Sequence, residues 1–335
     1  MSISTSTSTS ATTTTRETRG VLEIDDFHRL FALGDVHGDL PRLVAVLEAV
    51  GLITVDPREG LVRWAAPPGT VLVQVGDQLD SAPRDATSPT EWEPREDVVD
   101  LHVVEFMTSL ADVAARSGSR VVSCLGNHEV MNLTGEFSYV SAHSLRATGG
   151  VAGRAALLAP GGAYARRHFL AREIAVRVGP FLFCHAGLLP WHVPVLGAAR
   201  AELRRALAGD DPGAGVPELL RDPDGPLWTR EVALGPAGPA SARAVCRAFG
   251  ARHMVVGHTV TPEPVWRGDM DILLLDTGVS RSIGGNAAYV LEYQHAGRAR
   301  VLRVDVHSSQ DHWRVDDVAA PSPAEEPFTY GACLD

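Results

Sequence analysis

Short apolar runs alternate with longer amphipathic stretches through the first half of the chain. The runs lie at 30–35, 70–77 and 120–127, and the amphipathic stretches lie at 40–50 and 95–118. Continuous apolar runs are typical of strands that are buried on both faces, whereas apolar positions repeating every three to four residues indicate helices. Asp39 stands where it can cap the first of these helices. The alternation predicts βαβ units around a buried sheet.

The second half of the chain has a different pattern. Strand-like runs are found at 173–178, 181–187 and 253–258, and a helix is expected at 241–250. Further strand-like segments then follow one another directly, at 271–277, 287–293 and 300–306. Consecutive strands of this kind predict antiparallel additions to the first sheet or a second sheet. The expected fold class is α/β.

Composition marks the two ends of the folded region. Residues 1–20 begin with a low-complexity Ser/Thr run, which predicts a disordered tail and not a signal peptide. Residues 313–335 are rich in proline and acidic side chains, and we expect a second tail there. One catalytic domain is expected over 21–312, in which the Gly- and Arg-rich segment 134–172 is either a cap over the site or a solvated insertion.

Charge and cysteine content narrow the class of protein. The formal net charge is −11, which disfavours binding to nucleic acid or to an anionic membrane, and no apolar run is long enough to span a bilayer. An anionic substrate therefore needs a local positive site. All 30 basic residues are arginines, whose planar head group can bind two phosphate oxygens at once. The 4 scattered cysteines favour buried thiols in a reducing compartment, so we expect a cytoplasmic protein.

Polar side chains directly follow several of the strand-like runs. They are Asp35 and His37, Asp77 and Asp80, Asn127, His128 and Glu129, His185, and His258. In an extended segment the side chains of Asp35 and His37 point to the same side. Carboxylate, amide and imidazole groups without a thiolate suit Mn, Fe, Zn or Mg better than a soft metal. Asp77, after the middle strand, is the natural group to bridge two ions.

Each of these signals has a simpler interpretation when it is taken singly. A Gly-Asp at a strand end is often a turn, an Asn can cap a helix, and a lone histidine on an apolar strand is usually a hydrogen-bonded core residue. Together, however, these interpretations leave a set of polar groups buried at strand ends without partners, which is costly. A shared metal centre explains all of them at once.

In this order the motifs resemble those of the calcineurin-like metallophosphoesterases. The motifs read GDVHGD, GDQLD, GNHE, CHAG and GHT. The chain looks most like the phosphoprotein phosphatase branch, because it has GHTV where many other members of the family, including nucleases, have GHxH. Segments such as LDTGVSRSIGG are similar to bacterial Shewanella-like phosphatases. The resemblance covers about residues 31–293. It implies a metallophosphoesterase-type β-sandwich of two mixed sheets flanked by helices, with a dimetal site at the loop edge.

The resemblance also implies a role for each motif residue. The ligands of the first ion would be Asp35, His37 and Asp77, and those of the second would be Asp77, Asn127, His185 and His258. The two ions (Mn, Fe or Zn) would activate a bridging hydroxide for direct attack on phosphorus. His128 would protonate the leaving group, and Asp80 would keep its imidazole oriented.

One departure from the branch concerns phosphate binding. Members usually have an arginine directly after the aspartate of the second motif, whereas Ser81 follows Asp80 in this chain. Arg230 matches a family position that supplies a second phosphate clamp. Arg84 could replace the missing arginine, or it could be a solvated loop charge paired with Asp85.

These features predict a metal-dependent phosphomonoesterase whose substrate is a phosphorylated protein or peptide, on serine/threonine or on tyrosine. One alternative is a small-molecule phosphohydrolase of the same fold, such as a dinucleoside tetraphosphate hydrolase. Another is a pseudophosphatase, a binding module that has kept the metal ligands and lost its phosphate clamp. The intact ligand set together with His128 and Asp80 favours the enzyme.

Overall fold

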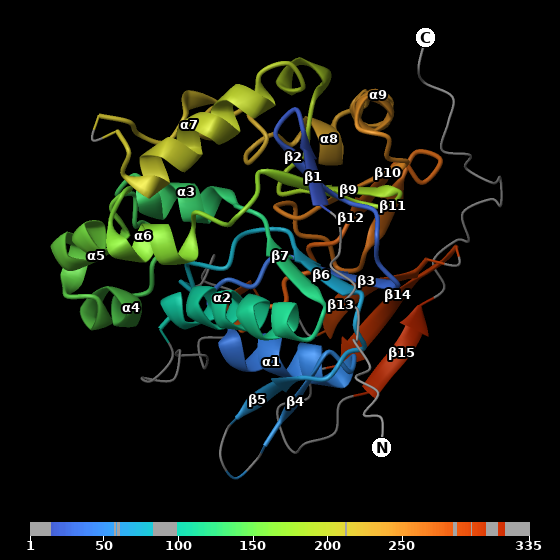
Figure 1. Cartoon of the computed structure of the whole chain (residues 1–335), viewed down its shortest axis with the longest axis horizontal. Coiled ribbons are helices and arrows are strands. Elements are labelled where there is room, and N and C mark those ends of the chain that lie inside the picture. The colour runs from blue at the N-terminus through green and yellow to red at the C-terminus, as the bar shows by residue number, and fades with distance from the viewer. Residues whose placement is uncertain are drawn as a thin grey trace, which may run out of the picture.

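A computed structural model shows two large β-sheets packed face to face, with helices on both outer sides (Figure 1). The structure describes residues 15–56, 58, 61–82, 99–211, 213–283, 287–295, 297–305 and 314–318. The arrangement confirms the predicted α/β sandwich of two mixed sheets flanked by helices.

The six-stranded sheet has the order β15-β14-β13-β3-β6-β7. Its strands are β3 (Arg29–Leu33), β6 (Thr70–Gln74), β7 (Arg120–Ser123), β13 (Ala287–Gln294), β14 (Arg298–Asp305) and β15 (Arg314–Val318). The first three strands in sequence are parallel, and β13 to β15 add antiparallel beside β3. The late runs at 287–293 and 300–306 are therefore antiparallel additions to the first sheet, whereas the late run at 271–277 lies in the second sheet, so both predicted arrangements occur.

The seven-stranded sheet has the order β1-β2-β8-β9-β10-β12-β11. Its strands are β1 (Thr15–Thr18), β2 (Val21–Ile24), β8 (Ala175–Val178), β9 (Phe181–Cys184), β10 (His253–Val256), β11 (Val265–Arg267) and β12 (Ile272–Leu274). Strands β9, β10 and β12 are parallel neighbours. A separate hairpin, β4 (Ile53–Val55) and β5 (Val62–Trp64), packs near α1 and α2.

The core consists of layers because alternate side chains of a strand point to opposite faces. In β3, Leu30 and Ala32 lie in the cluster between the two sheets, whereas Phe31 and Leu33 pack towards α1 and α2. In β9, Phe183 faces the other sheet and Leu182 faces the outer helices. Each central strand is thus buried on both faces, which explains its continuous apolar sequence.

The helices cover the outer faces of the two sheets (Figure 1). They are α1 (Leu40–Ala49), α2 (Leu101–Arg116), α3 (Asn127–Leu133), α4 (Ala142–Ala147), α5 (Gly150–Leu158), α6 (Ala163–His168), α7 (Leu196–Ala208), α8 (Glu231–Leu234) and α9 (Gly238–Ala248), with short 3-10 turns η1 (Pro190–His192), η2 (Glu218–Leu220) and η3 (Arg281–Ile283). Asp39 caps α1 as predicted, accepting a hydrogen bond from the backbone N–H of Arg42. Within the described part of the chain, no helix has the length and apolarity needed to cross a membrane.

The folded region extends further than the predicted boundaries at 21 and 312. Strand β1 lies inside the expected N-terminal tail, and it pairs antiparallel with β2 through a tight turn at Arg19 and Gly20, both of which have positive φ. Strand β15 lies inside the expected C-terminal tail and pairs with β14. Backbone pairing to an existing sheet edge orders these segments, and their polar composition did not reveal it. The rest of the two tails lies outside the described residues.

Candidate active site

The predicted site residues meet at one edge of the sandwich. Strands β3, β6 and β7 are in parallel register, with Leu33 beside Gln74 and Gln74 beside Ser123. Strands β9, β10 and β12 are parallel in the other sheet. Parallel strands present their carboxyl ends at the same edge, which is where α/β sheets bind ligands. Six loops, three from each sheet, therefore bring the polar groups together.

The backbone at this edge is held in an unusual conformation. His37, Asp77, Asp80 and His258 all have positive φ, at 42°, 53°, 69° and 62°. This region is uncommon for residues other than glycine, and such strain concentrates at functional sites. All four residues lie in the loops that follow β3, β6 and β10 at this edge.

Close packing explains why the motifs GNHE and GHT begin with glycine. A Cβ at Gly126 would lie 2.1 Å from Oδ1 of Asp77, and a Cβ at Gly257 would lie 2.2 Å from Oδ1 of Asp35. Neither approach is possible for a residue with a side chain. The loops can therefore bring their polar groups together only with glycine at these two positions.

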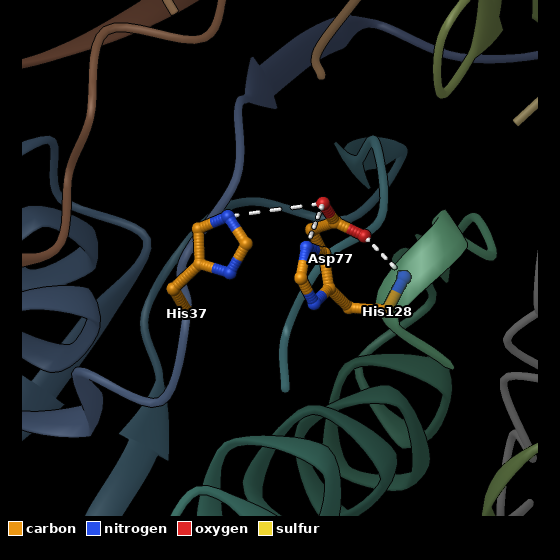
Figure 2. Close-up of side chains that lie close together, drawn as sticks. All are labelled: His37, Asp77 and His128. Atoms are coloured by element: carbon orange, nitrogen blue, oxygen red, sulfur yellow. Dashed lines mark hydrogen bonds and ion pairs between the residues drawn. The ribbon is translucent and has the colours of Figure 1, made fainter. Parts of the chain in front are cut away.

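Asp77 lies between the two halves of the site. Its Oδ2 is 3.3 Å from Nε2 of His185, 3.7 Å from Nε2 of His37 and 3.8 Å from Nε2 of His128. Figure 2 shows the carboxylate between His37 and His128, with its other oxygen accepting a hydrogen bond from the backbone N–H of His128. Asp77 thus lies between residues of the two predicted ligand sets.

The predicted second ligand set is brought together around Asn127. Its Oδ1 is 2.9 Å from Nε2 of His185 and 3.0 Å from Nδ1 of His258. One atom each from Asp77, His185 and His258 can be chosen so that all lie within 4.8 Å of one another.

The predicted first ligand set is looser. Nε2 of His37 is 4.0 Å from Oδ2 of Asp35. A second group within 4.8 Å consists of His37, Asp77 and His128. His128 was predicted as an acid and not as a ligand, and its other ring nitrogen is bound to Asp80. The geometry alone therefore places an additional imidazole beside the first set.

The three predicted imidazole ligands are oriented by backbone carbonyls. Nδ1 of His37 donates to the carbonyl of Leu79 at 3.0 Å, and Nδ1 of His185 donates to that of Val75 at 3.0 Å. His258 donates from Nε2 to the carbonyl of Trp228 at 3.1 Å. Each bond orients the ring and turns its other nitrogen towards the centre of the site, as in metal-ligating histidines.

The electrostatics of the site also fit bound cations. Burial raises the pKa of Asp35 well above its ordinary value, and the neighbouring Asp276 and Asp77 raise it further. Burial likewise lowers the pKa of His258 to about 3, with His185 adding to the effect, so its imidazole is neutral and able to ligate. Among the described residues, Oδ1 of Asp35 is buried with no hydrogen-bond donor other than the neighbouring carboxyl of Asp276. A bound cation would stabilise such adjacent buried carboxylates, and these oxygen and nitrogen donors suit hard to borderline metals.

Burial opposes ionisation of Asp77, but the neighbouring imidazoles outweigh burial. His185, His128 and His37 together hold the pKa of the Asp77 carboxyl well below its ordinary value. The carboxylate is therefore charged across the usual pH range, as a bridging ligand must be.

Glu129 ties the loops of the six-stranded sheet together. Its two buried carboxylate oxygens accept hydrogen bonds from the backbone N–H groups of Gly126, Asp77, Gln78 and Leu79 at 2.7 to 3.2 Å. The sequence placed Glu129 in the polar cluster without a role. Its position shows that it fixes the loop that carries Asp77 and does not face the cleft.

His128 and Asp80 form a close pair beside the ligand set. Nδ1 of His128 donates to Oδ2 of Asp80 at 2.6 Å. This bond leaves Nε2 on the side of Asp77 and the cleft. The pair has the geometry of a general acid whose orientation is held by a carboxylate.

Asp276 belongs to the site and was missed. It follows β12, is fully buried and lines the cleft beside Asp35. Its carboxyl interacts with that of Asp35, and its Oδ2 has no other hydrogen-bond partner among the described residues. The sequence ILLLDTG has the same pattern of an apolar run followed by Asp as the other motifs, so that signal was present.

A cleft of about 510 Å³ opens over these groups. Apart from site residues it is lined by Tyr139, Pro223, Trp228, Arg230, Val260 and Ile283. Arg230 is exposed at its wall, with Nη1 3.1 Å from Oγ1 of Thr259. Arg84 lies outside the described residues.

The segment 134–172 consists largely of helices α4, α5 and α6. Among described residues of this segment, Tyr139 alone lines the cleft, with its ring centroid 5.1 Å from that of His128. The helices stand beside α2 and α3 at one side of the molecule (Figure 1). These three helices, which we call the side wall, lie beside the site, and the cap stays a prediction.

Comparison with known proteins agrees with this geometry. The family model for calcineurin-like phosphoesterases matches residues 28–262. Shewanella-like protein phosphatase 2 of Arabidopsis thaliana is 25% identical over 322 residues, covering 82% of this chain and 77% of that protein. An uncharacterized protein of Schizosaccharomyces pombe is 30% identical over 277 residues, covering 77% of this chain and 75% of that protein.

A solved structure has the same fold. The cold-active protein tyrosine phosphatase of a psychrophilic Shewanella species has a TM-score of 0.65 at 21% identity, covering 85% of this chain and 80% of that chain. The family match includes every predicted ligand from Asp35 to His258. The chain belongs to the calcineurin-like phosphoesterase family, whose members hydrolyse phosphoric esters.

Proposed function

We propose that this chain is a cytoplasmic protein phosphatase, a dimetal phosphomonoesterase acting on phosphoserine/threonine or phosphotyrosine. The observation that carries the proposal is the His128–Asp80 pair, at 2.6 Å, beside a buried set of oxygen and nitrogen donors in an open cleft. A pseudophosphatase has no need to keep an oriented acid next to its ligands. The relatives named as Shewanella-like protein phosphatases support a phosphoprotein substrate.

The donor set would hold two ions, Mn, Fe or Zn. The residues for the first would be Asp35, His37 and Asp77, and those for the second Asp77, Asn127, His185 and His258. When bound, such ions activate a water as nucleophile and neutralise charge on the phosphoryl oxygens. Backbone carbonyls already hold the imidazoles in place, so these side chains would need little rearrangement when the ions bind.

His128 and Arg230 would act on the substrate itself. The leaving ester oxygen needs a proton, and Nε2 of His128, on the cleft side of the ring, can supply it while Asp80 holds Nδ1. The guanidinium of Arg230 lies at the cleft wall, where its planar fork can bind phosphate oxygens. Arg84 remains a second candidate for this clamp.

The test compares substrates from the two classes. The full chain, reconstituted with Mn²⁺, is assayed on a panel of phosphoserine, phosphothreonine and phosphotyrosine peptides and on diadenosine tetraphosphate. We expect kcat/KM to be higher for at least one phosphopeptide class. Faster turnover of diadenosine tetraphosphate would assign the site to small-molecule hydrolysis instead.

A further inference from the structure

Arg154, on α5 of the side wall, is a fully buried cation close to the catalytic pair. Its relative exposure is 0%. Its Nη1 and Nη2 donate to the two carboxylate oxygens of Asp100 at 2.9 and 2.7 Å, and its Nε donates to Oδ1 of Asn132 at 2.7 Å. A buried guanidinium is costly unless its donors are matched in this way. Its donors are directed into the protein, so Arg154 does not replace the missing phosphate clamp.

The partners of Arg154 hold Asp80 from two directions. Nδ2 of Asn132 donates to Oδ1 of Asp80 at 2.8 Å, and Oδ2 of Asp100 accepts from the backbone N–H of Asp80 at 3.0 Å. The other oxygen of Asp80 accepts from His128. Asp80 has a φ of 69°, so its backbone is strained and needs such support.

The orientation of the Asn132 amide is set by its neighbours. Nε of Arg154 can only donate, so it must face the amide oxygen. The amide nitrogen then faces two acceptors, Asp80 and the carbonyl of His128 at 2.9 Å. Arg154 thereby determines which end of the amide meets Asp80.

The side wall makes further contacts here. Oγ of Ser144, on α4, accepts from the backbone N–H of Asp100 at 3.2 Å. The ring of Tyr139 lies edge-on against that of His128. Helix α5 also packs against α3, which carries His128 and Asn132 (Figure 1). Nη2 of Arg154 also lies 3.8 Å from Oδ1 of Asp80. The segment 134–172 thus contacts both members of the pair and the residues behind them.

Building on the proposed function, we propose that Arg154 and Asn132 are positioning residues for the general acid. Arg154 orients Asn132 and Asp100, these fix Asp80, and Asp80 aims the imidazole of His128. The role of the side wall is then to set the efficiency of leaving-group protonation, and not to bind phosphate.

The test uses leaving groups that differ in their need for a proton. We compare Arg154→Lys and Asn132→Ala with wild type on p-nitrophenyl phosphate and on an alkyl phosphate, with Mn²⁺ present. We expect kcat for the alkyl phosphate to fall roughly tenfold more than kcat for p-nitrophenyl phosphate, since only the alkoxide needs strong acid assistance. Arg167→Ala is the matched control, because Arg167 lies in the same segment in a solvent-exposed ion pair with Asp112, and it should behave as wild type.

A double variant separates positioning from a general structural role. In a His128→Ala background, Arg154→Lys should change the ratio of the two rates no further, because the acid is already gone. An equal loss for both substrates in Arg154→Lys and Asn132→Ala, or a loss that persists in full without His128, would overturn the inference.

A second readout needs no turnover. In the chelated protein, imidazole ¹⁵N spectra should report a hydrogen-bonded Nδ1–H for His128, assigned by its absence in His128→Ala. This signal should weaken in Arg154→Lys and Asn132→Ala and persist in Arg167→Ala. Unchanged signals in both network variants would overturn the inference. A wild-type chain that hydrolyses neither ester would contradict the proposed function, while these spectra would still test the inference.

Discussion

Asp77 makes more contacts within the site than its motif suggests. One carboxylate oxygen faces three imidazoles, and the other accepts from the backbone of His128. Its own backbone N–H is held by Glu129. At the scale of single residues, one carboxylate therefore lies between the two predicted ligand sets. Hydrogen bonds to backbone carbonyls orient the imidazoles around it.

His128 is the residue whose loss should depend most on the substrate. His128→Ala is expected to lower kcat for an alkyl phosphate by roughly 10²–10⁴, the usual contribution of a general acid. The loss should be smaller for p-nitrophenyl phosphate, and the metal content should be nearly retained. Steady-state kinetics with metal analysis would check this. Equal losses for both esters would give His128 another role.

The phosphate clamp has two candidate arginines, Arg230 and Arg84. Arg230→Ala should raise KM and lower kcat/KM by about tenfold or more, a loss of about 1.4 kcal/mol. Competitive inhibition by inorganic phosphate should weaken in parallel. Arg84→Ala should do likewise only if its loop has taken over the clamp. If both single variants and the double variant bind phosphate as wild type does, neither arginine is the clamp.

At the scale of elements, strand β12 shows how a strand end can supply a charge that opposes folding. Burial is the main cause that raises the pKa of Asp276, and the Asp77 carboxylate contributes. For an acid whose pKa is higher in the folded protein, the stabilising effect is complete below the unfolded pKa and is lost as pH rises through the folded one. Asp276 should therefore destabilise the metal-free protein at neutral pH.

The variant Asp276→Asn tests whether the Asp276 carboxylate destabilises the metal-free protein. In EDTA, the variant should unfold at a higher temperature than wild type at pH 7.5, and the difference should shrink as the pH approaches 4. Asn can still accept the hydrogen bond from the backbone N–H of Gly278. Thermal unfolding followed by circular dichroism over this range would check it. A difference that does not change with pH would show that ionisation of Asp276 is not the cause.

The elements also show what the sequence could predict. Apolar runs that end in Asp35, Asp77 and His185 identified both the strands and the site, because a strand buried on both faces carries its polar residues at its end. The signal for a helix cap also lies in a few neighbouring residues, as Asp39 at the start of α1 illustrates. Asp276 had the same signal, but its run was interpreted only as part of the late sheet.

Other parts could not be read from the sequence because they depend on contacts distant along the chain. Arg154 meets Asp100 from 54 residues away and Asn132 from 22, and no local pattern distinguishes it from a surface arginine. The order of strands in the seven-stranded sheet joins β2 to β8, a pairing that depends on the whole topology. The pairing of β1 with β2 is local, and it was missed for a different reason, because the Ser/Thr-rich composition of that segment indicated a disordered tail.

At the scale of the whole molecule, the site lies where the two sheets meet at one edge. Asp35, Asp77 and Asn127 come from the six-stranded sheet, whereas His185 and His258 come from the seven-stranded sheet. Ions bound between them would join the two halves of the sandwich.

Metal binding should therefore stabilise the whole fold. Because a ligand that binds only the folded state raises its stability, saturating Mn²⁺ should raise the Tm of the chelated chain. Asp77→Asn should lose most of this increase, since its carboxylate contributes to both ions. Differential scanning calorimetry would measure both. A full increase in the variant would argue against a shared bridging ligand.

Hydrolysis of p-nitrophenyl phosphate after chelation and Mn²⁺ add-back probes the proposed chemistry with a single assay. The wild-type chain should lose its turnover on chelation and recover it with Mn²⁺, and Asp77→Asn should stay inactive under both conditions with less bound metal. Turnover that survives complete chelation, or Asp77→Asn that is as active as wild type with Mn²⁺, would contradict a phosphatase built on these ligands.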